Sequence, residues 1–165
     1  MSSPQLMSTS LGCMAYVSAE ARQELLETIG TAADQIGLAL AALGAAYEQL
    51  DEHSADLLEE QLFRPVQAAY GRARRTHGGF AERHSLETRD FTPAVAGLPS
   101  TGVHGFIDAA VEAVATADHT LAELQDSMMP VEVGDAELRA GLAEVRELLG
   151  VVSGRAREFE RTLGR

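Results

Sequence analysis

The chain has 165 residues and a net charge of −12, a length that allows one domain with a sizeable core. The acidic balance argues against binding nucleic acids or anionic membrane surfaces, and Cys13, the single cysteine, excludes an internal disulfide. The N-terminus lacks the basic and apolar segments of a secretory signal, and the longest apolar run, Ile36–Tyr47, is too short to cross a bilayer. We therefore expect a cytoplasmic protein without membrane insertion.

Residues 1–17 show no apolar period and are expected to form a flexible N-terminal tail. Ser18 is a candidate N-cap for a first helix over 18–52, because its hydroxyl can accept a hydrogen bond from a free amide of the first turn. Apolar residues then recur at alternating spacings of four and three, which indicates a helix packed along another helix. They are Leu25, Ile29, Ala32, Ile36, Ala39, Leu43, Ala46 and Leu50.

Three glycines, Gly30, Gly37 and Gly44, recur every seven residues along this first helix. Each weakens an isolated helix by roughly 0.5–1 kcal/mol relative to alanine. Their common stripe therefore indicates that a neighbouring backbone approaches closely. The stripe is predicted to pack within the chain, or else to form a surface for self-association or for a protein partner.

A second helix is expected over 55–84, capped by Ser54 after a tight reversal; a continuous helix through to Arg64 is the alternative. Pro65 removes one backbone hydrogen bond, which predicts a kink near Gln61–Pro65. Residues 85–102 contain two prolines and no helical period, so they form one long connection. Connections of this length tend to be either functional or disordered.

Two further helices are expected over 103–129 and 135–164, the last one capped by Asp135. Both carry the same four-and-three apolar spacing as the first helix. Long helices joined by short turns pack as antiparallel hairpins, and two hairpins make a bundle. The sequence therefore predicts an all-α single domain, an antiparallel four-helix bundle in up-down-up-down order.

A basic cluster on the second helix, Arg72, Arg74 and Arg75, is the first candidate site. Guanidinium groups followed by Gly78–Gly79 can grip a phosphate or the carboxylate of a protein partner. The alternative is a solvated face whose arginines pair with the many acidic side chains, since exposed ion pairs contribute about 0–1 kcal/mol.

Three histidines form the second candidate. His77 and His84 share one face of the second helix, and His104 lies in the first turn of the third, so the expected topology brings them to one end of the bundle. Together with a carboxylate they can bind a metal or a small ligand. The Glu-x-x-His pairs of di-iron bundles are absent, so half-exposed histidines without a cofactor are the preferred interpretation.

Tyr47-x-x-x-Asp51 resembles the Tyr-x-x-x-Asp/Glu secretion signal of type VII secretion substrates, which are helical hairpins. The Trp-x-Gly turn of that family is missing because the chain has no tryptophan, and the match lies at the end of the first helix instead of after the second. The sequence is therefore not assigned to that family.

No catalytic or nucleotide-binding motif is present, so an enzyme is not expected. The predicted function is a non-enzymatic interaction or scaffolding protein that works through a helix surface, as a homodimer or bound to a protein partner. The alternative is a small-ligand or metal-binding bundle with its site at the end that holds residues 85–102.

Overall fold

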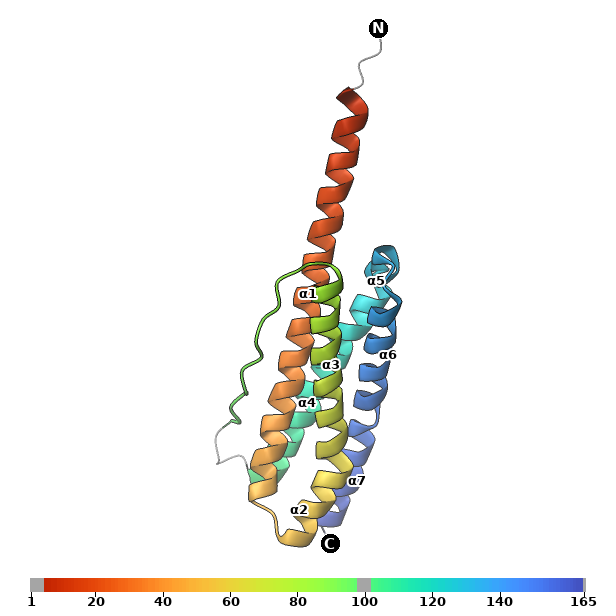
Figure 1. The fold of residues 1–165 in the computed structure, drawn as a ribbon. Helices are drawn as coiled ribbons and strands as arrows, with labels where there is room; N and C mark the ends of the chain where they lie inside the picture. Colours follow the sequence, from red (N-terminus) through yellow and green to blue (C-terminus); the bar gives the residue numbers. More distant parts are fainter. Residues whose placement is uncertain (1–4, 98–101, 165) are drawn as a thin grey trace.

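The computed structural model describes the backbone of residues 5–97 and 102–164, and the side chains of residues 19–97 and 102–164. Within this part of the chain all regular structure is helical and no strand occurs, so the all-α prediction is confirmed. Figure 1 shows the long helices lying side by side as rods, with an extended segment running along the outside.

Helix α1 (Gln5–Glu48) carries the first apolar stripe. It begins at Gln5, well before the expected cap Ser18, and therefore within the segment predicted to be a tail. Residues 1–4, and the side chains of the tail, lie outside the described residues. From Leu25 to Ala46 every residue of the stripe is buried, as its spacing predicts.

The second rod consists of α2 (Glu52–Leu58), the π-helical segment η1 (Glu59–Phe63) and α3 (Arg64–Arg83), which follow one another without a break. Its N-cap is Asp51, whose carboxylate accepts a hydrogen bond from the Ser54 amide at 3.3 Å. The prediction that Ser54 caps this helix is therefore wrong. The π-helical segment ends two residues before Pro65, at the place where a kink was expected, because proline lacks the N–H that would bond the Gln61 carbonyl. That carbonyl accepts a hydrogen bond from Arg155 instead, at 3.4 Å.

The C-terminal end of α3 closes with a left-handed residue, Ser85, at φ 54°. The Leu86 amide donates to the Ala81 carbonyl at 2.8 Å, and the Ser85 amide donates to the Glu82 carbonyl at 3.3 Å. This is the pair of bonds of a Schellman motif, in which glycine is the usual residue. The motif turns the chain out of α3 and into the extended connection, residues 86–97.

The connection runs back along α1 towards the other end of the bundle (Figure 1). Arg89 donates to the Gly30 carbonyl, and Val95 lies farther along α1, beside Leu38 and Ala42. Helix α4 (Gly102–Asp126) therefore starts at the far end, where His104 lies 3.8 Å from Glu160. As a result α4 runs in the same direction as α3 and antiparallel to α1, with which it makes its most extensive contact.

The up-down-up-down order is thus not confirmed, and the reason lies in the length of the connection. Its twelve described residues, Leu86–Gly97, span up to about 40 Å when extended. The 20 residues of α3 span about 30 Å as a helix. A connection of this length can return the chain to the opposite end of the rods, whereas a short turn cannot.

The last rod begins after α5 (Met129–Val133) and contains α6 (Ala136–Gly150) and α7 (Val152–Leu163). Gly134 at φ 73° ends α5, and Asp135 caps α6 as predicted, accepting a hydrogen bond from the Leu138 amide at 2.9 Å. Arg146 ties α6 to α4 through Asp118 at 2.9 Å.

The core lies between the rods and is built almost wholly from Leu, Ile, Val, Ala and Phe. Among the described glycines, Gly141 of α6 has the closest neighbour, since an added Cβ would lie 2.3 Å from the Thr76 hydroxyl of α3. This contact is not part of any predicted stripe.

By length and composition, residues Ala19–Glu48 of α1 are apolar enough to cross a membrane, with a mean hydropathy of 1.3 over the most apolar window. Half of that window is buried inside the bundle. A core helix that buries its apolar face inside a bundle can be equally long and equally apolar.

Candidate functional site

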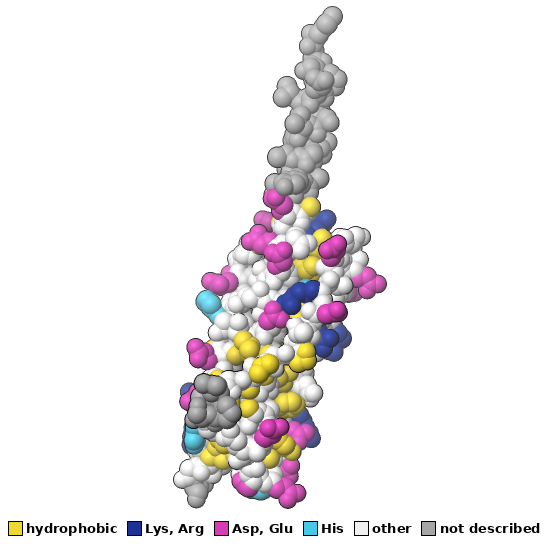
Figure 2. All heavy atoms as spheres, turned by 90° about the vertical axis from the view of Figure 1, so that its left-hand side faces the viewer, with side chains coloured by type: hydrophobic (Ala, Val, Ile, Leu, Met, Phe, Trp, Pro, Cys, Tyr) yellow, Lys and Arg dark blue, Asp and Glu magenta, His cyan; other side chains and the backbone are white. Residues whose placement is uncertain are grey.

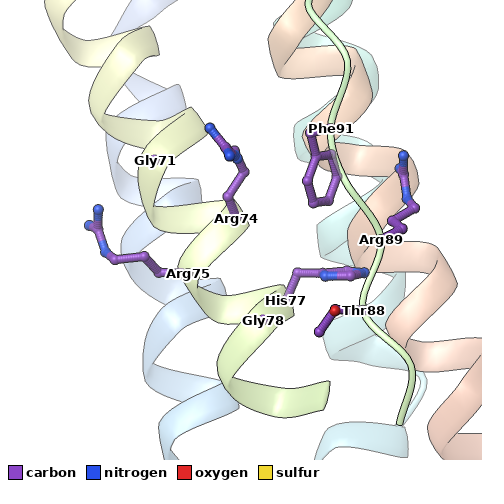
Figure 3. Close-up of a pocket in the computed structure, with 8 residues that line it drawn as sticks. All are labelled: Gly71, Arg74, Arg75, His77, Gly78, Thr88, Arg89 and Phe91. Carbon is purple, nitrogen blue, oxygen red and sulfur yellow. The ribbon is translucent and has the colours of Figure 1, made fainter. Parts of the chain in front are cut away.

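A surface hollow of about 360 Å³ lies between α3 and the connection. We call it the arginine hollow. It is lined by Gly71, Arg74, Arg75, His77 and Gly78 of α3 and by Thr88, Arg89 and Phe91 of the connection. Figure 3 shows His77 pointing from α3 towards the connection and Arg74 extending along the side of α3 that faces the connection, whereas Arg75 points away from the connection.

The hollow exists because α3 presents glycines where side chains would otherwise stand. Gly71 and Gly78 are seven residues apart and so lie on one face of the helix. An added Cβ at Gly78 would meet no atom within 4 Å, and at Gly71 it would meet only the end of the Arg75 side chain at 3.3 Å. Substituting either glycine would therefore fill open space without a clash against backbone.

Aromatic rings hold two of the guanidinium groups in place. The Arg89 guanidinium lies 4.2 Å above the Phe91 ring, and that of Arg74 lies 5.4 Å from the Tyr70 ring and 5.8 Å from Phe91. Stacking of this kind uses the flat face of a guanidinium and leaves the N–H groups at its edge free to donate. The arrangement presents donors that are already oriented.

His77 forms the inner wall of the hollow and is 3% exposed. Its ring meets Phe91 edge-on, with the centroids 5.1 Å apart. Burial lowers the pKa of His77, the positive charge of Arg89 lowers it further, and Asp34 opposes the shift. The imidazole is therefore neutral near pH 7, and its contacts are those of a packing residue.

Arg89 anchors the connection to α1. Its Nη2 donates to the Gly30 carbonyl at 2.9 Å and to the Asp34 carboxylate at 2.6 Å. A Cβ at Gly30 would lie 3.1 Å from the same nitrogen, and one at Gly37 would lie 3.4 Å from the Tyr70 ring. Two glycines of the stripe thus accommodate side chains of this same chain.

Gly44, the third glycine of the stripe, has no atom within 4 Å of an added Cβ. It lines a separate hollow of about 290 Å³ with Tyr47, Glu48, Glu59 and Phe63. Of the three glycines in the predicted stripe, Gly44 is thus the one without a side chain packed against it.

The structure separates Arg72 from the other two arginines of the basic cluster. Arg72 pairs with Glu144 of α6 at 2.5 Å and so links two helices. Arg74 and Arg75 are exposed, and within the described residues no carboxylate lies within ion-pair distance of either. The predicted cluster is thus divided between one bridging arginine and two beside the hollow.

The three histidines do not meet, which corrects the prediction that they converge. His84 lies at the end of α3, 2.9 Å from Asp135, and His104 lies at the opposite end of the bundle because the connection returns the chain there. Among the described residues no group of three His, Cys, Asp or Glu side chains is close enough to hold a metal ion. The proposed ligand set His77, His84 and His104 is therefore not assembled.

Asp135 joins α3 to α6 at that end of the bundle. It accepts two hydrogen bonds from Arg83, both at 2.9 Å, and one from the Leu138 amide. Burial by itself would raise the pKa of Asp135, but the bonds from Arg83, Leu138 and His84 outweigh burial and lower it to about 2. His84 therefore helps to fix two helices.

Sequence reasoning did not identify Arg89, Phe91 or Gly141 as important. Arg89 and Phe91 belong to a segment without periodicity, so no pattern relates them to α3. Gly141 could have been noticed in the sequence, because a glycine inside a helical pattern costs stability and a close packing contact is one reason for it. Comparisons of the chain with models of known families, with curated proteins and with solved structures found no match.

Proposed function

We propose that this chain is a non-enzymatic interaction protein that docks a protein partner at the arginine hollow. One observation carries the proposal: the lining of the hollow contains three arginines and no acidic residue, in a chain whose net charge is −12. Figure 2 shows acidic side chains scattered over the face that carries the connection, with basic side chains confined to a few places. A local cationic site on an acidic body favours a partner that presents a negative group there.

The hollow suits a docking role for a second reason. Arginine and aromatic residues are both enriched at the energetic centres of protein interfaces. Arg74 and Arg89 both stack on Phe91, so little side-chain freedom is lost when they bind. The surrounding helices form what we propose to be one four-helix bundle, with a single long crossover connection that supplies one wall of the site.

We also propose a homodimer, but the glycine stripe supports it less than the arginine hollow supports docking of a protein partner. Arg89 and Tyr70 lie against Gly30 and Gly37, so a second chain would have to bind at Gly44, near the exposed Tyr47. Light scattering of Gly44→Leu tests this: a smaller mass than the wild type places a dimer contact there.

The docking proposal is tested with the full chain as bait. Proteins that co-purify are identified, and the affinity of the best candidate is measured for wild type and for Arg74→Glu/Arg75→Glu. Arg157→Glu/Arg161→Glu on α7 is the matched control, because it makes the same change in net charge away from the hollow. We expect at least about tenfold weaker binding for the first variant. Equal weakening of binding in both variants would show that affinity depends only on the net charge of the chain, and would contradict docking at the arginine hollow.

A further inference from the structure

We propose that the arginine hollow binds the dianionic oxygens of a phosphate group, as free phosphate or as a phosphomonoester. The inference rests on the proposed function in that both use Arg74 and Arg75. It names the chemistry that the hollow recognises, and a titration with inorganic phosphate tests it without any partner.

Space and donors suit a tetrahedral anion. The hollow of about 360 Å³ is open at the surface, so a phosphate group can enter while the remainder of an ester stays in solvent. The Arg74 guanidinium and the Thr88 hydroxyl supply hydrogen-bond donors along its wall. Figure 3 shows Arg89 on the far side of the connection, where its Nη2 donates to the Gly30 carbonyl of α1, so Arg89 contributes mainly its positive charge. Arg75 also lines the hollow, but Figure 3 shows its side chain pointing away from the connection. Its flexible side chain would have to rotate to bring the guanidinium to the same anion.

The balance of charge favours a dianion over a single carboxylate. Of the three arginines in the lining, Arg89 is already paired with Asp34 at 2.6 Å. Arg74 and Arg75 remain, and His77 contributes no charge near pH 7. These two guanidiniums, which have no carboxylate within ion-pair distance in the described part of the chain, match the charge of about −1.5 to −2 that a phosphomonoester carries at neutral pH.

Most acidic residues of the protein lie too far away to cancel this local field, because charges farther than about 8–10 Å are largely screened at physiological ionic strength. The nearer carboxylates of the connection, Glu87 and Asp90, are adjacent in sequence to the lining residues but are exposed and do not line the hollow. The larger hollow beside α6, about 600 Å³, is lined by Glu60, Glu144 and Glu147 as well as by arginines. A phosphate is therefore expected to prefer the arginine hollow.

Because Thr88, Arg89 and Phe91 belong to the connection, the bound anion would bridge α3 and the connection. Phosphate is thus expected to slow hydrogen exchange of the amides of residues 86–91. Acetate at the same ionic strength is expected to have no such effect.

The full chain is titrated with inorganic phosphate by calorimetry and by NMR, with sodium acetate and sodium chloride at matched ionic strength as references. Two variants remove the site in different ways: Arg74→Gln/Arg75→Gln removes charge, and Gly78→Leu fills space while retaining all charges. Arg157→Gln/Arg161→Gln is the control for charge. We expect saturable binding to the wild type and the control, and at least about tenfold weaker binding to both hollow variants. Circular dichroism verifies that each variant is folded.

The inference is overturned if phosphate shows no saturable binding, if acetate binds as well as phosphate, or if the control loses as much affinity as the hollow variants. Titration with O-phosphoserine distinguishes the source. Tighter binding than inorganic phosphate supports an ester, and equal or weaker binding supports free phosphate. If phosphate binds but an identified partner keeps its affinity for Gly78→Leu, the inference stands and the docking proposal fails.

Discussion

Gly141→Ala is expected to destabilise the protein even though alanine is the better helix former. The new Cβ would lie 2.3 Å from the Thr76 hydroxyl, 2.8 Å from its methyl group and 3.1 Å from its Cβ. Rotating the threonine side chain moves the hydroxyl and the methyl group but leaves its Cβ in place. Rotation also breaks the hydrogen bond from the Thr76 hydroxyl to the Arg72 carbonyl, which measures 2.8 Å. Helices α3 and α6 must therefore move apart.

The magnitude follows from two opposing contributions. Alanine in place of glycine within a helix gains about 1 kcal/mol, whereas an extra methyl group in a close-packed contact costs about 1–3 kcal/mol. The net loss is about 1 kcal/mol, which lowers the Tm of a domain of this size by about 2–4 °C. Gly154→Ala on α7 is the control, because that glycine is exposed and has no atom within 4 Å of an added Cβ. The control is expected to gain up to about 1 kcal/mol.

Thermal and urea unfolding, followed by far-UV circular dichroism, measure both variants. A Thr76→Ala background provides a further check, because it removes the two closest atoms, and there Gly141→Ala should become nearly neutral. If Gly141→Ala stabilises the wild type as much as Gly154→Ala does, the two helices do not approach as closely as described.

Three further predictions concern Asp135 and Ser85 at the C-terminal end of α3, and the buried imidazole of His77. Asp135 has a pKa of about 2 in the folded protein against an ordinary value of 3.8, so the stability it contributes is present above pH 4 and is lost as pH falls towards 2. Asp135→Asn should be less stable by up to about 2 kcal/mol at pH 6, and the difference should shrink at low pH in urea unfolding. The pKa of His77 is lowered by burial, so the unfolded chain takes up a proton first as pH falls below the ordinary histidine value of 6.5, and folding stability decreases. His77→Phe, which cannot titrate, should show a flatter dependence of stability on pH between pH 7 and 5. Ser85→Gly should raise the unfolding free energy by up to about 1 kcal/mol, because glycine adopts the left-handed φ of 54° without strain.

Each of these predictions has a contrary outcome. A constant difference between Asp135→Asn and wild type from pH 6 to pH 2 would show that the carboxylate is not held by Arg83. An unchanged pH profile for His77→Phe would mean that the imidazole is accessible to solvent. A less stable Ser85→Gly would indicate that the serine hydroxyl contributes more than the backbone strain removes.

The sequence by itself determined the helices and their buried faces. A helix repeats about every 3.6 residues, so the four-and-three spacing of residues such as Ile36, Val114 and Val152 fixes which side is apolar, and all three are buried. The cap at Asp135 was equally predictable, because it depends only on a carboxylate reaching an amide three residues ahead. These features are local in the chain.

Only the tertiary structure decided the direction of α4, and with it the site. A segment as long as 85–102 can either turn back at once or cross to the far end of the rods, and local patterns do not distinguish these two paths. Because the chain crosses, Arg89 and Phe91 lie beside Arg74 and His77, while His104 lies at the other end. The arginine hollow is therefore a contact between distant segments, created by the path of the connection and by the missing side chains of Gly71 and Gly78.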